Sequence, residues 1–132
     1  MNGIGIKVVG IGTVGNNVLN KMVEKEIAEV ELVGIDTNQR NLDKLNVESK
    51  ILVSENLSGE VQDVLKGTDL VFILTDVVEK ENSEIAQIVS KVAKTMEILT
   101  IVVAATPINS NEEPEEIEKL KEVTFQKDMG TI

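Results

Sequence analysis

Three glycines near the start of the chain form a pattern that can bind a phosphate group. Gly10, Gly12 and Gly15 follow an apolar run and precede an amphipathic segment. A glycine lets a phosphate approach the backbone closely, because no Cβ stands in the way. The free N–H groups and the positive dipole end of the following helix then face the anion. We therefore expect a strand, a phosphate-binding turn and a helix in this region.

A carboxylate about 20 residues after the last of these glycines offers a second nucleotide contact. Asp36 ends an apolar, β-branched stretch. An acid at the end of the second strand is placed to accept hydrogen bonds from a ribose 2′-hydroxyl. This spacing is typical of NAD-type dinucleotide-binding domains. The alternative interpretation is an exposed Asp that merely ends a strand.

Three further residues complete the predicted cofactor-binding set. Thr13 and Val14 occupy variable positions between the second and third glycines, so they do not exclude binding. Asn16 either contacts a phosphate or lies in the first helical turn without a ligand role. The glycines have a similar alternative, in which they form a tight strand–helix turn that is kept only for packing.

Acidic residues later in the chain raise the question of a metal site. Asp76, Glu79, Glu81 and Glu84 lie close together in sequence. We interpret them as a solvated loop followed by a helix start that negative charge favours, and expect no metal. The chain has no Cys and no His, which excludes disulfides, thiol chemistry and the usual zinc sites.

Composition limits the classes of partner. The net charge is −10 and the only aromatic residues are two Phe, so neither phosphate-backbone attraction nor base stacking favours nucleic-acid binding. No apolar run reaches the roughly 20 residues of a membrane span, and no cleavable signal is evident, so we expect no membrane partner. A hydrophobic share of 42% fits a globular protein. We expect a cytoplasmic protein.

Apolar β-branched stretches alternate with helical periodicity along the chain, which predicts an α/β fold. The stretch 38–46 is polar, and no helix or strand is predicted in it. Asn82 or Ser83 is expected to cap the longest later helix. The predicted strands are 4–9, 30–36, 51–53, 69–75 and 98–105, and the predicted helices are 14–27, 61–67 and 83–96.

The last two predicted strands are apolar at nearly every position, as a parallel sheet covered on both faces requires. We predict a doubly wound, three-layer α/β/α sandwich with a mainly parallel, five-stranded, Rossmann-like sheet. Its ligand crevice should lie outside the carboxyl ends of the strands. The 132 residues are expected to form one domain, with a core over 1–106 and an acidic tail over 107–132. The tail carries a predicted helix over 115–122.

Four stretches of the chain resemble the bacterial cell-division GTPase FtsZ of the tubulin superfamily, in the family's order. The resemblance implies the N-terminal GTP-binding domain of that family, with GTP or GDP as ligand and with itself or an FtsZ-like protein as partner. The stretches are 6–17 (Ile-Lys-Val-Val-Gly-Ile-Gly-Thr-Val-Gly-Asn-Asn), 33–38 (Val-Gly-Ile-Asp-Thr-Asn), 67–73 (Gly-Thr-Asp-Leu-Val-Phe-Ile) and 85–107.

The chain also departs from the family's pattern. After the fourth predicted strand the family has a loop Gly-Gly-Gly-Thr-Gly-Thr-Gly that wraps the phosphates, whereas residues 75–82 here read Thr-Asp-Val-Val-Glu-Lys-Glu-Asn. Arg40 is the only Arg, so the family's nucleotide-contacting Arg has no counterpart. The acids that complete hydrolysis would lie beyond residue 132. Because phosphoryl transfer depends on positioning and charge neutralisation, we expect no hydrolysis and no catalytic residues.

Three functional hypotheses from different classes follow. The first is a degenerate FtsZ-like domain that binds GDP or GTP weakly without hydrolysis, and that can act through protein–protein association. The second is a module that has lost its ligand and works through its surface. The third is an NAD-type dinucleotide-binding domain, which the glycine pattern together with Asp36 supports.

Overall fold

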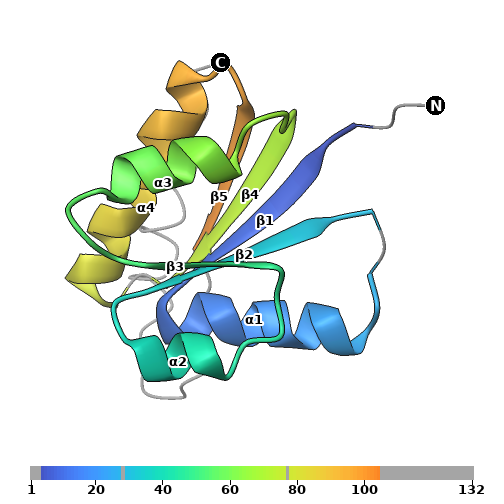
Figure 1. Cartoon of the computed structure of the whole chain (residues 1–132), viewed down its shortest axis with the longest axis vertical. Helices are drawn as coiled ribbons and strands as arrows, with labels where there is room; N and C mark the ends of the chain where they lie inside the picture. The colour runs from blue at the N-terminus through green and yellow to red at the C-terminus, as the bar shows by residue number, and fades with distance from the viewer. Residues whose placement is uncertain (1–3, 28, 77, 105–132) are drawn as a thin grey trace, which may run out of the picture.

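The computed structural model describes residues 4–27, 29–76 and 78–104. Over these residues strands and helices alternate along the chain (Figure 1). The strands are β1 (Ile6–Ile11), β2 (Glu31–Asp36), β3 (Ser49–Leu52), β4 (Leu70–Thr75) and β5 (Leu99–Ala104). The helices are α1 (Gly12–Glu24), α2 (Gln39–Asp43), α3 (Leu57–Val64) and α4 (Lys80–Thr95).

The described strands form one sheet in the order β3-β2-β1-β4-β5, and every neighbouring pair is parallel. The predicted doubly wound fold is confirmed, and the sheet is entirely parallel rather than mainly so. The reason is the connectivity: each of the strands β1 to β4 is followed by a helix that returns the chain to the same end of the sheet. All carboxyl ends of the strands therefore meet at one edge, where such folds bind ligands.

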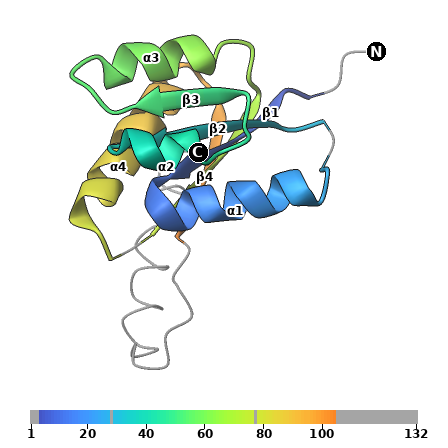
Figure 2. The same ribbon diagram turned by 60° about the horizontal axis from the view of Figure 1, so that its bottom comes forward.

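The helices cover both faces of the sheet (Figure 2). Helices α1 and α2 lie on one face, and α3 and α4 pack together on the other. The larger apolar core lies under α3 and α4. It joins side chains such as Val9, Ile35 and Ile73 of the sheet to Val61 of α3 and Val89 of α4. A smaller core of Val8, Leu19 and Leu74 lies under α1.

Helices α2, α3 and α4 differ from the sequence prediction, and α3 covers Leu57–Val64 instead of 61–67. Helix α2 lies within the polar stretch 38–46, where no helix was predicted. The Asn38 side chain accepts a hydrogen bond from the Arg40 N–H at 2.8 Å, and Leu42 is buried, so a cap and one apolar anchor stabilise this short helix. Helix α4 begins at Lys80, before the predicted caps Asn82 and Ser83, and its first turn is preceded by Glu79 without a side-chain cap.

The boundaries of β1 and α1 also differ from the prediction. Strand β1 continues through Gly10 to Ile11, and α1 begins at Gly12 instead of residue 14. The phosphate-type turn is therefore shorter than expected, and the chain passes from strand to helix at Gly12. The acidic tail 107–132 and its predicted helix over 115–122 lie outside the described residues.

Close packing explains two of the three glycines in the opening pattern. A Cβ on Gly15 would overlap the carbonyl oxygen of Leu74 in β4, which is backbone and cannot rotate away. A Cβ on Gly10 would lie 2.8 Å from Leu19 Cδ1 in α1. The absence of these two Cβ atoms lets α1 approach β1 and β4, which sets the position of the first turn of α1.

We predict that Gly15→Ala lowers the free energy of unfolding by about 2 kcal/mol, because the added methyl group forces α1 away from β4. Gly59→Ala in α3 is the matched control. The nearest atoms to its Cβ would all belong to the side chain of exposed Asn56, which can rotate, and alanine favours a helix by up to about 1 kcal/mol. Urea unfolding followed by circular dichroism measures both. Equal stabilities of the two variants would contradict the packing argument.

Candidate functional site

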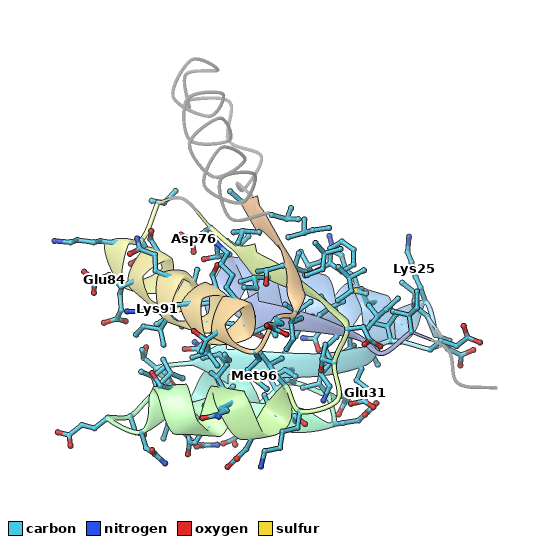
Figure 3. All side chains as sticks on the ribbon, turned by 90° about the horizontal axis from the view of Figure 1, so that it is seen from above. Lys25, Glu31, Asp76, Glu84, Lys91 and Met96 are labelled. Carbon is cyan, nitrogen blue, oxygen red and sulfur yellow. The ribbon has the colours of Figure 1, made fainter. Side chains whose placement is uncertain are left out.

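A cleft of about 470 Å³ opens at the carboxyl edge of the sheet. Three segments line it: the first turn of α1, the turn between β2 and α2, and the connection from β4 to α4. Figure 3 shows Asp76, which follows β4, at the end of the molecule opposite Lys25 and Glu31. The lining residues are Gly12, Thr13, Val14, Asp36, Thr37, Asn38, Asn41, Asp76, Val78, Glu79, Glu81 and Asn82.

The first turn of α1 presents backbone donors to the cleft. Gly12 has φ +72°, a left-handed conformation that glycine adopts without strain, and Thr13 and Val14 follow it along the wall. The residue before the helix, Ile11, provides no side-chain cap. The first N–H groups of a helix have no acceptor within the helix and carry partial positive charge. This wall can therefore bind an anion.

The β2–α2 wall is organised by Asp36. Its side chain is buried, not exposed as the strand-end interpretation assumed. Oδ1 accepts a hydrogen bond from the Asn38 N–H at 2.9 Å, and Oδ2 accepts one from Asn41 Nδ2 at 3.2 Å. Asp36 thus closes the turn before α2 and lines the cleft at the same time. Each carboxylate oxygen retains capacity to accept a further bond, so a ribose hydroxyl remains chemically compatible with this wall.

The β4–α4 wall is organised by a second buried carboxylate. Asp76 is 4% exposed, and its Oδ1 accepts hydrogen bonds from the Val78 N–H at 3.0 Å and the Glu79 N–H at 2.8 Å. Its Oδ2 accepts one from Asn82 Nδ2 at 2.8 Å. The interpretation of this region as a solvated acidic loop is wrong for Asp76, because its carboxylate binds the donors that precede α4.

Three of the predicted site residues lie outside the cleft lining. Gly10 and Gly15 make the packing contacts described above. Asn16 is buried beneath the first turn of α1, and its Nδ2 donates to the Ile35 carbonyl oxygen at 3.1 Å, which ties α1 to β2. Gly12, Thr13, Val14 and Asp36 do line the cleft.

Sequence reasoning missed Thr37, Asn38 and Asn41 as cleft residues. The sequence did contain a signal for these residues. Asn and Asp side chains often accept a hydrogen bond from the backbone N–H two residues on, so an Asp that ends a strand indicates a turn directly after it. Within 4–27, 29–76 and 78–104, no group of three or more metal-ligating acids, His or Cys is present. No helix in these ranges is long and apolar enough to cross a membrane.

No protein-family model matches the chain. The cell division protein FtsZ of Aquifex aeolicus is 34% identical over 134 residues, a match that covers 86% of this chain and 36% of that protein. This chain has an FtsZ/tubulin-like N-terminal domain. The resemblance to FtsZ that the sequence motifs indicated is confirmed. The cleft lies outside the carboxyl ends of the strands, where a ligand crevice was expected from the sequence.

Solved structures share the fold of the FtsZ-like domain. An empty FtsZ dimer from M. jannaschii matches with a TM-score of 0.76 at 23% identity, covering 93% of this chain and 43% of that one. TubZ from the Clostridium botulinum phage c-st matches with a TM-score of 0.70 at 16% identity, covering 96% and 47%. The chain therefore spans less than half the length of these relatives.

We predict that Asp76→Ala lowers the free energy of unfolding by about 1–3 kcal/mol, because the Val78 and Glu79 N–H groups lose their acceptor. The matched control is Glu79→Ala, at an exposed carboxylate in the same turn that makes no capping bond. Its effect should stay within about 0.5 kcal/mol. Urea denaturation of both variants measures the difference, and an Asp76→Ala variant as stable as the control would refute this role.

Proposed function

We propose that this FtsZ-like domain binds a guanine nucleotide, GDP or GTP, weakly and without hydrolysing it. The observation that carries the proposal is the cleft at the carboxyl edge of the sheet, where the uncapped start of α1 faces the space enclosed by the β2–α2 turn. Folds of this type place ligands at this edge. The sequence resemblance to FtsZ supports the choice of a guanine nucleotide.

The walls suggest an orientation for the nucleotide. Its phosphate group lies at the backbone N–H groups of Gly12, Thr13 and Val14, where the helix dipole favours an anion. Its ribose lies toward Asp36 and Asn41, whose side chains offer an acceptor and a donor for hydroxyl groups. Gly10, Gly15 and Asn16 support this wall through packing and do not contact the ligand.

The charge of the cleft supports binding without hydrolysis. All charged side chains among the described lining residues are acidic: Asp36, Asp76, Glu79 and Glu81. Catalysis of phosphoryl transfer depends on cationic groups that neutralise the developing charge. These walls supply carboxylates instead, and they contribute no Lys or Arg. The same acids limit the affinity for a polyphosphate, which accounts for weak binding.

We expect calorimetric titration of the nucleotide-stripped protein to show saturable binding of GDP or GTP. We also expect that the protein releases no phosphate from GTP. Saturation with NAD but not with guanine nucleotides would favour the dinucleotide alternative, and Asp36→Ala should then weaken binding strongly because it removes the ribose acceptor. Absence of heat with all three ligands would refute the proposal and favour a ligand-free module.

A charge variant locates the bound phosphate within the same titration. Thr13→Asp places a carboxylate in the first turn of α1 and should weaken nucleotide binding by about tenfold or more, the equivalent of about 1.4 kcal/mol. Asn17→Asp is the matched control, since Asn17 is equally exposed on α1 but does not line the cleft. Equal weakening by the two variants would contradict a phosphate at this turn.

Self-association is a second candidate function, favoured by the exposed face of β5. Leu99, Ile101 and Val103 are 50%, 38% and 40% exposed along one side of this edge strand. They lie on the face that carries α1, and no described helix covers β5 there. Contiguous exposed apolar side chains often mark an association surface.

We expect light scattering to report a molecular mass that rises with protein concentration, because pairing of these faces buries apolar surface. Ile101→Lys should keep the measured mass closer to that of the monomer. The control variant Lys50→Arg changes β3, at the other edge of the sheet, and should leave the rise in mass with concentration unchanged. A constant monomer mass up to high concentration would contradict self-association.

A further inference from the structure

The starts of α1 and α4 both border the cleft, and a buried carboxylate, that of Asp76, lies just before α4. The first turn of α1 has no side-chain cap. The chain that leads into α4 has its Val78 and Glu79 N–H groups bonded to the carboxylate of Asp76. A negative group at a helix start occupies the position that an anionic ligand would take. The α4 side of the cleft therefore already contains its anion.

We propose that Asp76 sets the number of phosphate groups that the cleft accepts, so that the domain binds GDP in preference to GTP. This inference rests on the proposed nucleotide-binding function and specifies its ligand. A phosphate at α1 meets backbone N–H groups without a side-chain cap, whereas a phosphate chain extended toward α4 meets the buried carboxylate of Asp76. Asp76 is thus a specificity-determining residue.

Asn82 closes the space between the two helix starts. Its Nδ2 donates to Asp76 Oδ2 at 2.8 Å, and its side chain lies against the open side of Gly12. A Cβ on Gly12 would come within 2.7 Å of Asn82 Cγ, so this carboxamide fills the region directly beside the first turn of α1. A terminal phosphate that passed from α1 toward α4 would have to displace it.

Burial makes the charge of Asp76 more effective than that of the other acids on this wall. Asp76 is 4% exposed, whereas Glu79 and Glu81 are exposed to solvent. Water and salt screen an exposed carboxylate efficiently, but they screen a buried one much less. Repulsion grows with the charge of the ligand, and GTP carries one phosphate more than GDP. The penalty therefore falls mainly on GTP.

Calorimetric titration with GDP and with GTP, both without divalent cations, tests this inference through the ratio of the two dissociation constants. In the unaltered protein GDP should bind about tenfold more tightly than GTP, as expected for one close charge pair. Asp76→Asn should reduce the ratio to about twofold or less. Asparagine removes the charge but keeps an oxygen that can accept from the Val78 and Glu79 N–H groups.

Two further variants separate charge from turn geometry. Glu81→Gln removes one carboxylate from the same wall at an exposed position and should leave the ratio unchanged. The double variant Asp76→Asn with Asn82→Asp exchanges the two groups, so that a carboxylate and an amide still face each other. It should restore the preference for GDP, because it returns the negative charge to the cleft.

Salt dependence provides a measurement that needs no variant and therefore does not depend on the folding of Asp76→Asn. Raising the ionic strength should bring the dissociation constants for GTP and GDP closer together in the unaltered protein, because salt screens the repulsion between Asp76 and the phosphates. Equal affinities for the two nucleotides, or a ratio that Asp76→Asn leaves unchanged, would overturn this inference while nucleotide binding stands. Failure of both nucleotides to bind would instead refute the proposed function.

Discussion

The close approach of α1 to β1 and β4 is the contact on which the rest of the cleft depends. Gly15 lies against the backbone of Leu74 and Gly10 against Leu19, with no room for a Cβ at either position. This packing fixes where α1 begins, and Asn16 adds a hydrogen bond to the Ile35 carbonyl that ties the helix to β2. These contacts position the uncapped N–H groups of the first turn.

Two buried carboxylates give the cleft its chemical character. Asp36 ends β2 and Asp76 follows β4, the two strands that flank β1, and each accepts hydrogen bonds from residues that come after its strand. They stabilise the turns, and they also place negative charge on two walls of the same space. In the binding mode that we propose, a nucleotide uses the α1 wall as its anion site while the α4 wall discourages further phosphates. The fold is FtsZ-like, and the charged side chains among the described residues that line the cleft are all acidic.

Much of the fold could be predicted, because its signals are local and strong. The continuous apolar character of β4 and β5 indicated a covered parallel sheet, and the glycine pattern located the β1–α1 turn. Helix α2 was missed because its five residues are polar apart from Leu42, and its stability comes from a cap and a tertiary contact. The start of α4 was misplaced because Asn82, a typical cap, bonds Asp76 instead. Propensity describes what a side chain can do near its own backbone, but not which partner tertiary packing brings to it.

By itself, the sequence determined the order of the strands along the chain, the parallel sheet, the edge at which the cleft opens and the likeness to FtsZ, since these follow from hydrophobic period and from motifs in register. Only the tertiary structure decided which motif residues face the cleft. Gly10, Gly12 and Gly15 look equivalent in the pattern, yet Gly12 borders the cleft while the other two pack α1 onto the sheet. Likewise, Asp76 looked like one acid among several until the fold buried it against the start of α4. The physical reason is that sequence spacing places residues along an element, whereas burial and hydrogen-bond partners depend on the elements that pack around it.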